Sequence, residues 1–128
     1  RRRQRLICQY IKDCSAQVII LQETHLKQTE CNALIIKQRW VNQLVSSDQS
    51  LISKGVAILI KSSAGAEILE HKTDASGRGV IAKICSRWGI CTVAVFDGRN
   101  EDDPTPLYTL VAKLLDFPSP YIVGVILI

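Results

Sequence analysis

The chain has 128 residues, of which 47% are hydrophobic and 22% charged, and its formal net charge at pH 7 is +4. This length and composition indicate one globular domain and exclude a disordered tail. The longest apolar runs are too short to span a bilayer, so we expect no membrane partner. No signal-peptide pattern follows the opening arginines, so we expect an intracellular protein, with the nucleus included among the locations, and not a secreted one.

The cysteines and the distribution of charge limit which kinds of functional site the sequence favours. The five cysteines are odd in number, form no C-x-x-C pair and are accompanied by only two histidines, which is poor material for a structural zinc site. We therefore interpret the thiols as small buried hydrophobic groups in a reducing compartment. Four of the 16 basic residues lie in the first five positions, and a solvated helix start explains them as well as a phosphate contact does.

The first third of the chain alternates between helix and strand. Apolar residues at three- and four-residue spacing predict an amphipathic helix over residues 2–14. The short run Gln17 to Gln22 has the pattern of a strand buried on both faces, as in a parallel sheet. We expect a second helix from Thr29 to Arg39 and a strand from Trp40 to Ser46.

From Gly55 onward successive strands replace this alternation. We expect strands at Val56 to Lys61, Ala66 to His71, Gly79 to Cys85 and Ile90 to Phe96, the last two joined as a hairpin at Gly89. Asp103-Pro104 predicts the start of a helix whose apolar face consists of Leu107, Leu110, Val111, Leu114 and Leu115. The chain stops inside an apolar strand, Tyr121 to Ile128, so the domain looks cut short.

Glu23 is the first candidate for chemistry, because it follows the Gln17 to Gln22 strand in the sequence I-I-L-Q-E-T-H-L. A carboxylate at the carboxyl end of a strand lies where open α/β sheets build their sites, and it supplies the hard oxygen that Mg²⁺ prefers. From these eight residues alone, a solvated loop glutamate is the slightly favoured alternative.

The order of several motifs along the chain favours a functional Glu23 over a solvated loop glutamate. After I-I-L-Q-E-T-H-L come S-K-G-V-A-I-L-I-K, D-A-S-G-R-G-V-I, V-A-V-F and E-D-D-P. In this order the chain resembles the endonuclease/exonuclease/phosphatase superfamily, and within it the apurinic-type endonuclease domain of LINE retrotransposons. The resemblance implies a DNase I-like α/β sandwich, Mg²⁺ as cofactor and DNA as substrate. It also implies that Glu23 is the catalytic, metal-binding glutamate.

The resemblance also assigns other positions and shows departures. Asp74, Gly77 and Arg78 match a structural turn motif, and Phe96 falls where the family has a phosphate-contacting tyrosine, which makes it a substrate-binding candidate without the hydroxyl. Ile126 and Ile128 stand where the family's G-G-D-F-N has its Asp and Asn. The family's first strand and its late Asp and His have no counterpart here. Because such groups act as a unit, we expect catalysis to be impaired.

We therefore predict one truncated domain over residues 1–128, a partial two-layer α/β sandwich left from the DNA-nicking endonuclease of a LINE-type reverse transcriptase. The alternatives are a non-enzymatic DNA-binding or interaction domain, and part of an apurinic endonuclease whose other half lies elsewhere. Half a sandwich would leave the inner face of its sheet uncovered. We therefore expect either self-association through the Tyr121 to Ile128 strand or compensating packing of the helices.

Overall fold

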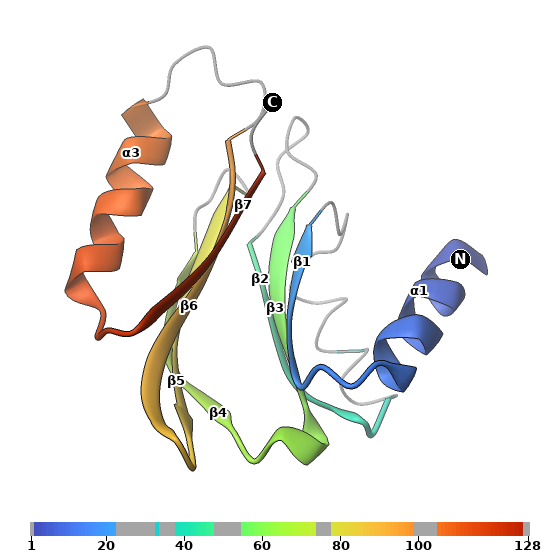
Figure 1. The fold of residues 1–128 in the computed structure, drawn as a ribbon. Coiled ribbons are helices and arrows are strands. Elements are labelled where there is room, and N and C mark those ends of the chain that lie inside the picture. Colours follow the sequence, from blue (N-terminus) through green and yellow to red (C-terminus); the bar gives the residue numbers. More distant parts are fainter. Residues whose placement is uncertain are drawn as a thin grey trace.

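The computed structural model describes residues 2–22, 33, 38–47, 55–73, 78–98 and 105–126. These residues form four layers, with a helix outside each of two stacked β-sheets (Figure 1). Helix α1 (Arg2–Asp13) covers one sheet, and helix α3 (Thr105–Ala112) covers the other. The predicted α/β sandwich fold is confirmed: its two sheets stack on each other, and each carries a helix on its outer face.

The first sheet has three strands in the order β1 (Val18–Gln22), β3 (Val56–Lys61) and β2 (Val41–Ser46). Both outer strands run antiparallel to β3. The prediction that β1 is a parallel strand buried on both faces is therefore wrong, since β1 lies at an edge and is only half-buried. The strand buried on both faces is β3, because its alternate residues face the second sheet and α1.

The second sheet has four strands in the order β4 (Glu67–Thr73), β5 (Gly79–Ser86), β6 (Gly89–Asp97) and β7 (Tyr121–Ile126). The predicted β5–β6 hairpin is confirmed, and Gly89 at its turn has φ +111°, which is a conformation that L side chains rarely adopt. Strand β7 returns after α3 and pairs with β6 in parallel. The Thr92 hydroxyl fixes this return by donating to the Pro118 carbonyl oxygen at 2.5 Å.

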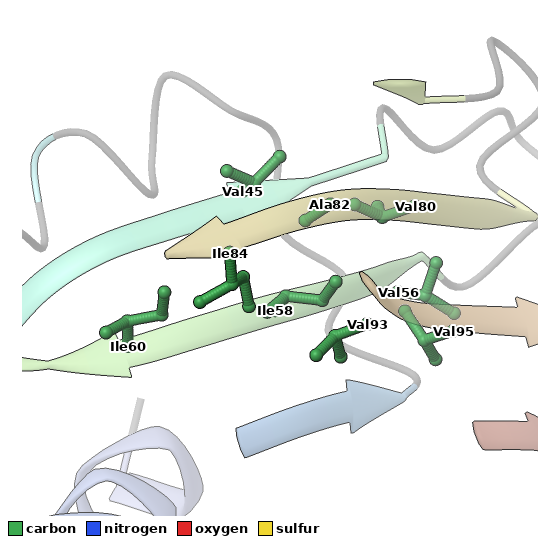
Figure 2. Packing of buried hydrophobic residues seen from close by; sticks show 9 residues of the cluster. All are labelled: Val45, Val56, Ile58, Ile60, Val80, Ala82, Ile84, Val93 and Val95. Atoms are coloured by element: carbon green, nitrogen blue, oxygen red, sulfur yellow. The ribbon is translucent and has the colours of Figure 1, made fainter. Parts of the chain in front are cut away.

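The main core lies between the two sheets. Figure 2 shows its nine buried side chains, which come from β2 and β3 on one side and β5 and β6 on the other: Val45, Val56, Ile58, Ile60, Val80, Ala82, Ile84, Val93 and Val95. Each sheet thus covers the inner face of its partner. The expectation of an uncovered inner face is wrong, because the strands that precede β4 assemble into a sheet of their own.

Two smaller clusters join the helices to the outer faces of the sheets. Ile11 of α1 packs against Val41, Leu44, Ala57 and Leu59, whereas Leu6 and Tyr10 of the predicted apolar stripe are 67% and 76% exposed. On the other side, Leu110 and Phe117 pack against Ile81, Ala94 and Phe96.

The predicted apolar face of α3 is confirmed only in part. Leu110 is buried and Leu114 half-buried, but Leu115 is 80% exposed. The α-helix ends at Ala112 and continues as the 3₁₀ helix η2 (Lys113–Asp116). A 3₁₀ turn has three residues instead of 3.6, so the α-helical spacing no longer holds by Leu115.

Lys61 is a buried cation that the sequence did not reveal. Its side chain is 5% exposed, and its Nζ donates to the carbonyl oxygens of Lys12 at 3.2 Å and Cys14 at 2.6 Å. These carbonyls belong to the last turn of α1 and the residue after it. Lys61 at the end of β3 therefore fixes the carboxyl end of α1 to the sheet, where a positive charge also suits the helix dipole.

Other predictions fall partly or wholly beyond the described residues. The predicted Thr29 to Arg39 helix lies largely outside them, as does the Asp103-Pro104 helix start. Cys8, Cys14, Cys85 and Cys91 are free thiols and are half-buried rather than fully buried. Among the described helices, none is long and apolar enough to cross a bilayer.

Candidate functional site

One end of the sandwich gathers the strand ends on which the candidate residues depend. We call it the site end: β1, β2, β4, β6 and β7 finish there, while β3 and β5 begin there. The opposite end carries the β5–β6 hairpin turn (Figure 1).

The two sheets are in contact close to the site end. Ile20, two residues before the end of β1, lies so near Gly124 of β7 that a Cβ on this glycine would be 3.3 Å from two Ile20 carbons. Gly124 is itself two residues before Ile126, the last residue of β7. The carboxyl ends of β1 and β7 are therefore neighbours across the sandwich.

Glu23, the predicted catalytic and metal-binding residue, lies outside the described residues. The structure does place the residue before it: Gln22 ends β1 and is paired with Val56, the first residue of β3. Strand β1 therefore ends at the site end, one residue before Glu23 in the sequence. The roles of Glu23 stay predictions.

Asp97 is a buried carboxylate that the sequence did not single out. It ends β6, is 4% exposed, and its alternation with Val93 and Val95 places its side chain on the inner face, between the sheets. Its backbone N–H donates to the Arg78 carbonyl oxygen at 2.8 Å. This bond holds the start of β5 against the end of β6, which agrees with the structural part predicted for Arg78. Asp74 and Gly77 of the same motif lie outside the described residues.

Two serines add buried polar groups at this end. Ser46 and Ser47 are 3% and 0% exposed, and the Ser47 N–H donates to the Val56 carbonyl oxygen at 3.0 Å. Together with Asp97 they make up three of the five buried polar or charged residues found in the described part of the chain. Buried polarity is therefore concentrated at the site end, and the rest of the inter-sheet core is apolar.

Phe96, the predicted substrate-binding residue, faces the other way. Its side chain is 2% exposed and belongs to the cluster beneath α3, with Ile81, Ala94, Leu110 and Phe117. Packing alone accounts for a phenylalanine at this position. A contact between Phe96 and substrate stays a prediction.

Ile126 stands beside Asp97, since the two are Cα partners in the β6–β7 ladder. By alternation the Asp97 side chain lies on the inner face at the site end. The resemblance implies an aspartate at Ile126, so an isoleucine here removes a carboxylate from the immediate surroundings of Asp97. Asp97 is therefore the buried carboxylate that the described residues place at this end.

The donor groups that remain do not make a metal site by themselves. No group of three or more His, Cys, Asp or Glu side chains that could hold a metal ion occurs within the described ranges. Mg²⁺ is held by one or two carboxylates together with substrate phosphate and water, in a near-octahedral arrangement. Asp97 would be one such carboxylate and Glu23 the second, and two carboxylates alone do not complete a site for metal-dependent hydrolysis.

The buried polar residues at the site end had only a weak signal in the sequence. Asp97 interrupts the apolar alternation of β6 at its last residue, and Ser46-Ser47 follow β2 directly. Polar residues at strand ends are commonly solvated turn residues, so only burial distinguishes these three.

Comparison with known proteins bears on the fold. No protein-family profile matches the sequence, and no curated protein matches it significantly. Among solved structures, tyrosyl-DNA phosphodiesterase 2 (TDP2) of D. rerio, humanised by 14 mutations, matches with a TM-score of 0.62 and 19% identity over 93% of this chain and 51% of that one. The D. rerio TDP2 complexed with a single-strand DNA product matches with a TM-score of 0.62 and 18% identity, over 93% and 50%.

The chain spans about half the length of these structures. At such low identity the likeness concerns the arrangement of the elements and not the chemistry. The structural match to TDP2 and the two stacked sheets between outer helices lead to the same fold. The chain has a DNase I-like α/β sandwich fold of the kind found in TDP2.

Proposed function

We propose that this chain is a relic of a divalent-metal-dependent DNA-nicking endonuclease domain of the LINE type, and that its catalysis is impaired. The observation that carries the proposal is the pairing of Asp97 with Ile126 at the site end. One buried carboxylate lies there between the sheets, whereas the neighbouring position that the family resemblance assigns to aspartate is isoleucine.

The position of Gln22, the residue before Glu23, supports the nuclease origin. Strand β1 ends with Gln22 at the end of the sandwich where Asp97 is buried. Phosphodiester hydrolysis requires a metal held by several oxygens, an activated water and stabilisation of the leaving oxygen. Two carboxylates can bind Mg²⁺ weakly, but they do not supply the remaining groups, so we expect metal-dependent cleavage to be very slow or absent.

DNA is the partner that this proposal implies. One of the TDP2 structures with this fold is complexed with a single-strand DNA product. The chain carries a net charge of +4, which is compatible with modest, salt-dependent affinity for phosphate. Binding without cleavage is the second candidate function, and the apolar Ile126 beside Asp97 favours it over an active enzyme.

A plasmid-nicking assay tests the catalytic part. Supercoiled DNA is incubated with the chain in Mg²⁺ or in chelator, and the wild type is compared with Glu23→Ala and Glu67→Ala. Glu67 is a suitable control because it is exposed and pairs with Cys85 near the hairpin turn, at the opposite end of the sandwich. We expect nicking close to background in all three proteins.

Strong Mg²⁺-dependent nicking that disappears only in Glu23→Ala would overturn the impairment and establish an active nuclease. Binding is measured separately, by fluorescence anisotropy of a labelled single-stranded oligonucleotide at two salt concentrations. We expect weak binding that decreases as salt increases, as counterion release requires. A folded chain with no measurable affinity at low salt would contradict the DNA-related origin.

A further inference from the structure

Strand β7 has an open edge lined with apolar side chains. Among the strands that the structure describes, β7 pairs only with β6. Four of its side chains are exposed large hydrophobic groups, at 40%, 56%, 44% and 47% for Tyr121, Ile122, Val123 and Val125. An apolar strand with unpaired backbone groups is a template for pairing with another chain.

The opposite edge of the same sheet is protected, and β7 is not. Strand β4 carries Glu67, Glu70, His71 and Lys72, and its register shifts between Ile68 and Glu70. Charges and irregular register are the usual means by which proteins block edge-to-edge pairing. The six residues of β7 include no charge and no proline, and their register with β6 is uninterrupted.

The register also shows which backbone groups face the open edge. The Thr92 N–H donates to the Pro120 carbonyl oxygen, so Pro120 points its backbone toward β6. Backbone direction alternates along a strand, so Ile122 and Gly124 also bond to β6, while Val123 and Val125 direct their N–H and C=O groups outward. The open edge therefore offers the two donors and two acceptors of these valines.

The sequence of β7 fits a second copy of itself. Residues 122–126 read I-V-G-V-I, which is the same in both directions about Gly124. We propose that β7 is the contact of a symmetric homodimer, in which two copies of this strand pair antiparallel with Gly124 opposite Gly124. Such a two-fold contact uses the same residues from both subunits, and the palindrome places valine opposite valine and glycine opposite glycine, so side chains of equal size meet across the axis.

This register satisfies the open groups on both sides. Val123 of each copy faces Val125 of the other in a hydrogen-bonded pair, and the two pairs together form four backbone hydrogen bonds. Ile122 of each copy stands opposite position 126 of the other in this register. The two glycines meet in a non-hydrogen-bonded pair, where Cα atoms approach to about 4.5 Å. The two four-stranded sheets would join into one sheet of eight strands, with the two site ends pointing in opposite directions.

Analytical ultracentrifugation over a concentration series tests the proposal. One strand edge is smaller than a standard interface of about 800 Å² per partner, so the dimer should dissociate on dilution. We expect the mass to rise from 14.2 kDa toward twice that value with concentration. Val123→Lys places a charge in the contact and should raise the dissociation constant about tenfold or more. Leu69→Lys, on the β4 edge, should leave it unchanged, and its starting exposure of 46% matches the 44% of Val123.

Amide hydrogen exchange tests the register. The amides of Val123 and Val125 should exchange more slowly as concentration rises, whereas those of Ile122 and Gly124, already bonded to β6, should not change. Circular dichroism establishes that both lysine variants are folded. A chain that stays monomeric throughout overturns the proposal, and so does a dimer that Val123→Lys does not weaken more than Leu69→Lys does.

Discussion

Replacing Lys61 with methionine tests whether a buried cation stabilises this fold or merely is tolerated by it. Methionine keeps an unbranched chain of similar length in the same space but removes the ammonium. The carbonyl oxygens of Lys12 and Cys14 then lose their donor, at the point where helix α1 ends and has unsatisfied carbonyls of its own.

The size of the effect follows from three contributions. A hydrogen bond from a charged donor is worth about 1.5–3 kcal/mol, and the 2.6 Å bond to Cys14 is the stronger of the two. The attraction to the carboxyl end of α1 adds about 0.3–1 kcal/mol. Burial of an ammonium that is only 5% exposed costs free energy in the opposite direction, and this cost disappears in the variant. We expect Lys61→Met to lower the free energy of unfolding by about 1–2 kcal/mol.

Urea unfolding followed by circular dichroism measures this difference, with Lys72→Met as the matched control. Lys72 is exposed on β4, so its replacement should change stability by less than about 0.5 kcal/mol. A Lys61→Met protein as stable as the wild type, or more stable, would refute the reasoning. It would mean that desolvation of the ammonium costs as much as its hydrogen bonds contribute.

Three further predictions concern the core and one thiol. Gly79→Ala should cost about 1–3 kcal/mol by overpacking, because its Cβ would overlap Leu110 and lie 3.0 Å from Phe96 Cδ1; thermal unfolding measures the loss. Ile58→Ala, in the inter-sheet core at 0% exposure, should cost about 2–5 kcal/mol in the same assay, and much more than Ile90→Ala at 45% exposure. Burial raises the pKa of the Cys8 thiol in the folded protein. The protonated thiol therefore contributes its full stability below the unfolded-state pKa, and this contribution is lost as pH rises through the folded-state pKa. The stability of Cys8→Ser should therefore fall less than that of the wild type above pH 9, and equal slopes in urea unfolding would contradict this.

The strands were predictable because alternation and turn residues are local signals. The hairpin at Gly89 and the strands on either side of it agree with the sequence analysis to within about one residue. The position of β1 was not predictable in this way. Its run V-I-I-L is apolar at every residue, and such a run does not distinguish a strand inside a parallel sheet from an edge strand half-covered by a second sheet and a helix.

Two buried charged residues, one at each end of the sandwich, were hidden for a related reason. Lys61 and Asp97 are the last residues of β3 and β6, where a charged side chain is expected to reach solvent. Their burial depends on what packs against those strand ends, and for Lys61 this is the end of α1, nearly fifty residues earlier in the chain. The sequence contains Lys61 and the end of α1, but it does not show that they lie close together.

The pairing of Asp97 with Ile126 has a consequence for stability as well as for function. A site that held several carboxylates between two sheets would place like charges close together in a region of low dielectric, which destabilises a fold unless a metal neutralises them. With isoleucine paired to Asp97, that repulsion is absent. Under the proposed origin, the isoleucine that replaces a catalytic carboxylate would also remove the need for a neutralising metal. If this is correct, Ile126→Asp should destabilise the chain without Mg²⁺, and Mg²⁺ should restore part of the loss. A variant equally stable with and without the metal would show that Glu23, Asp97 and residue 126 do not form a shared metal site.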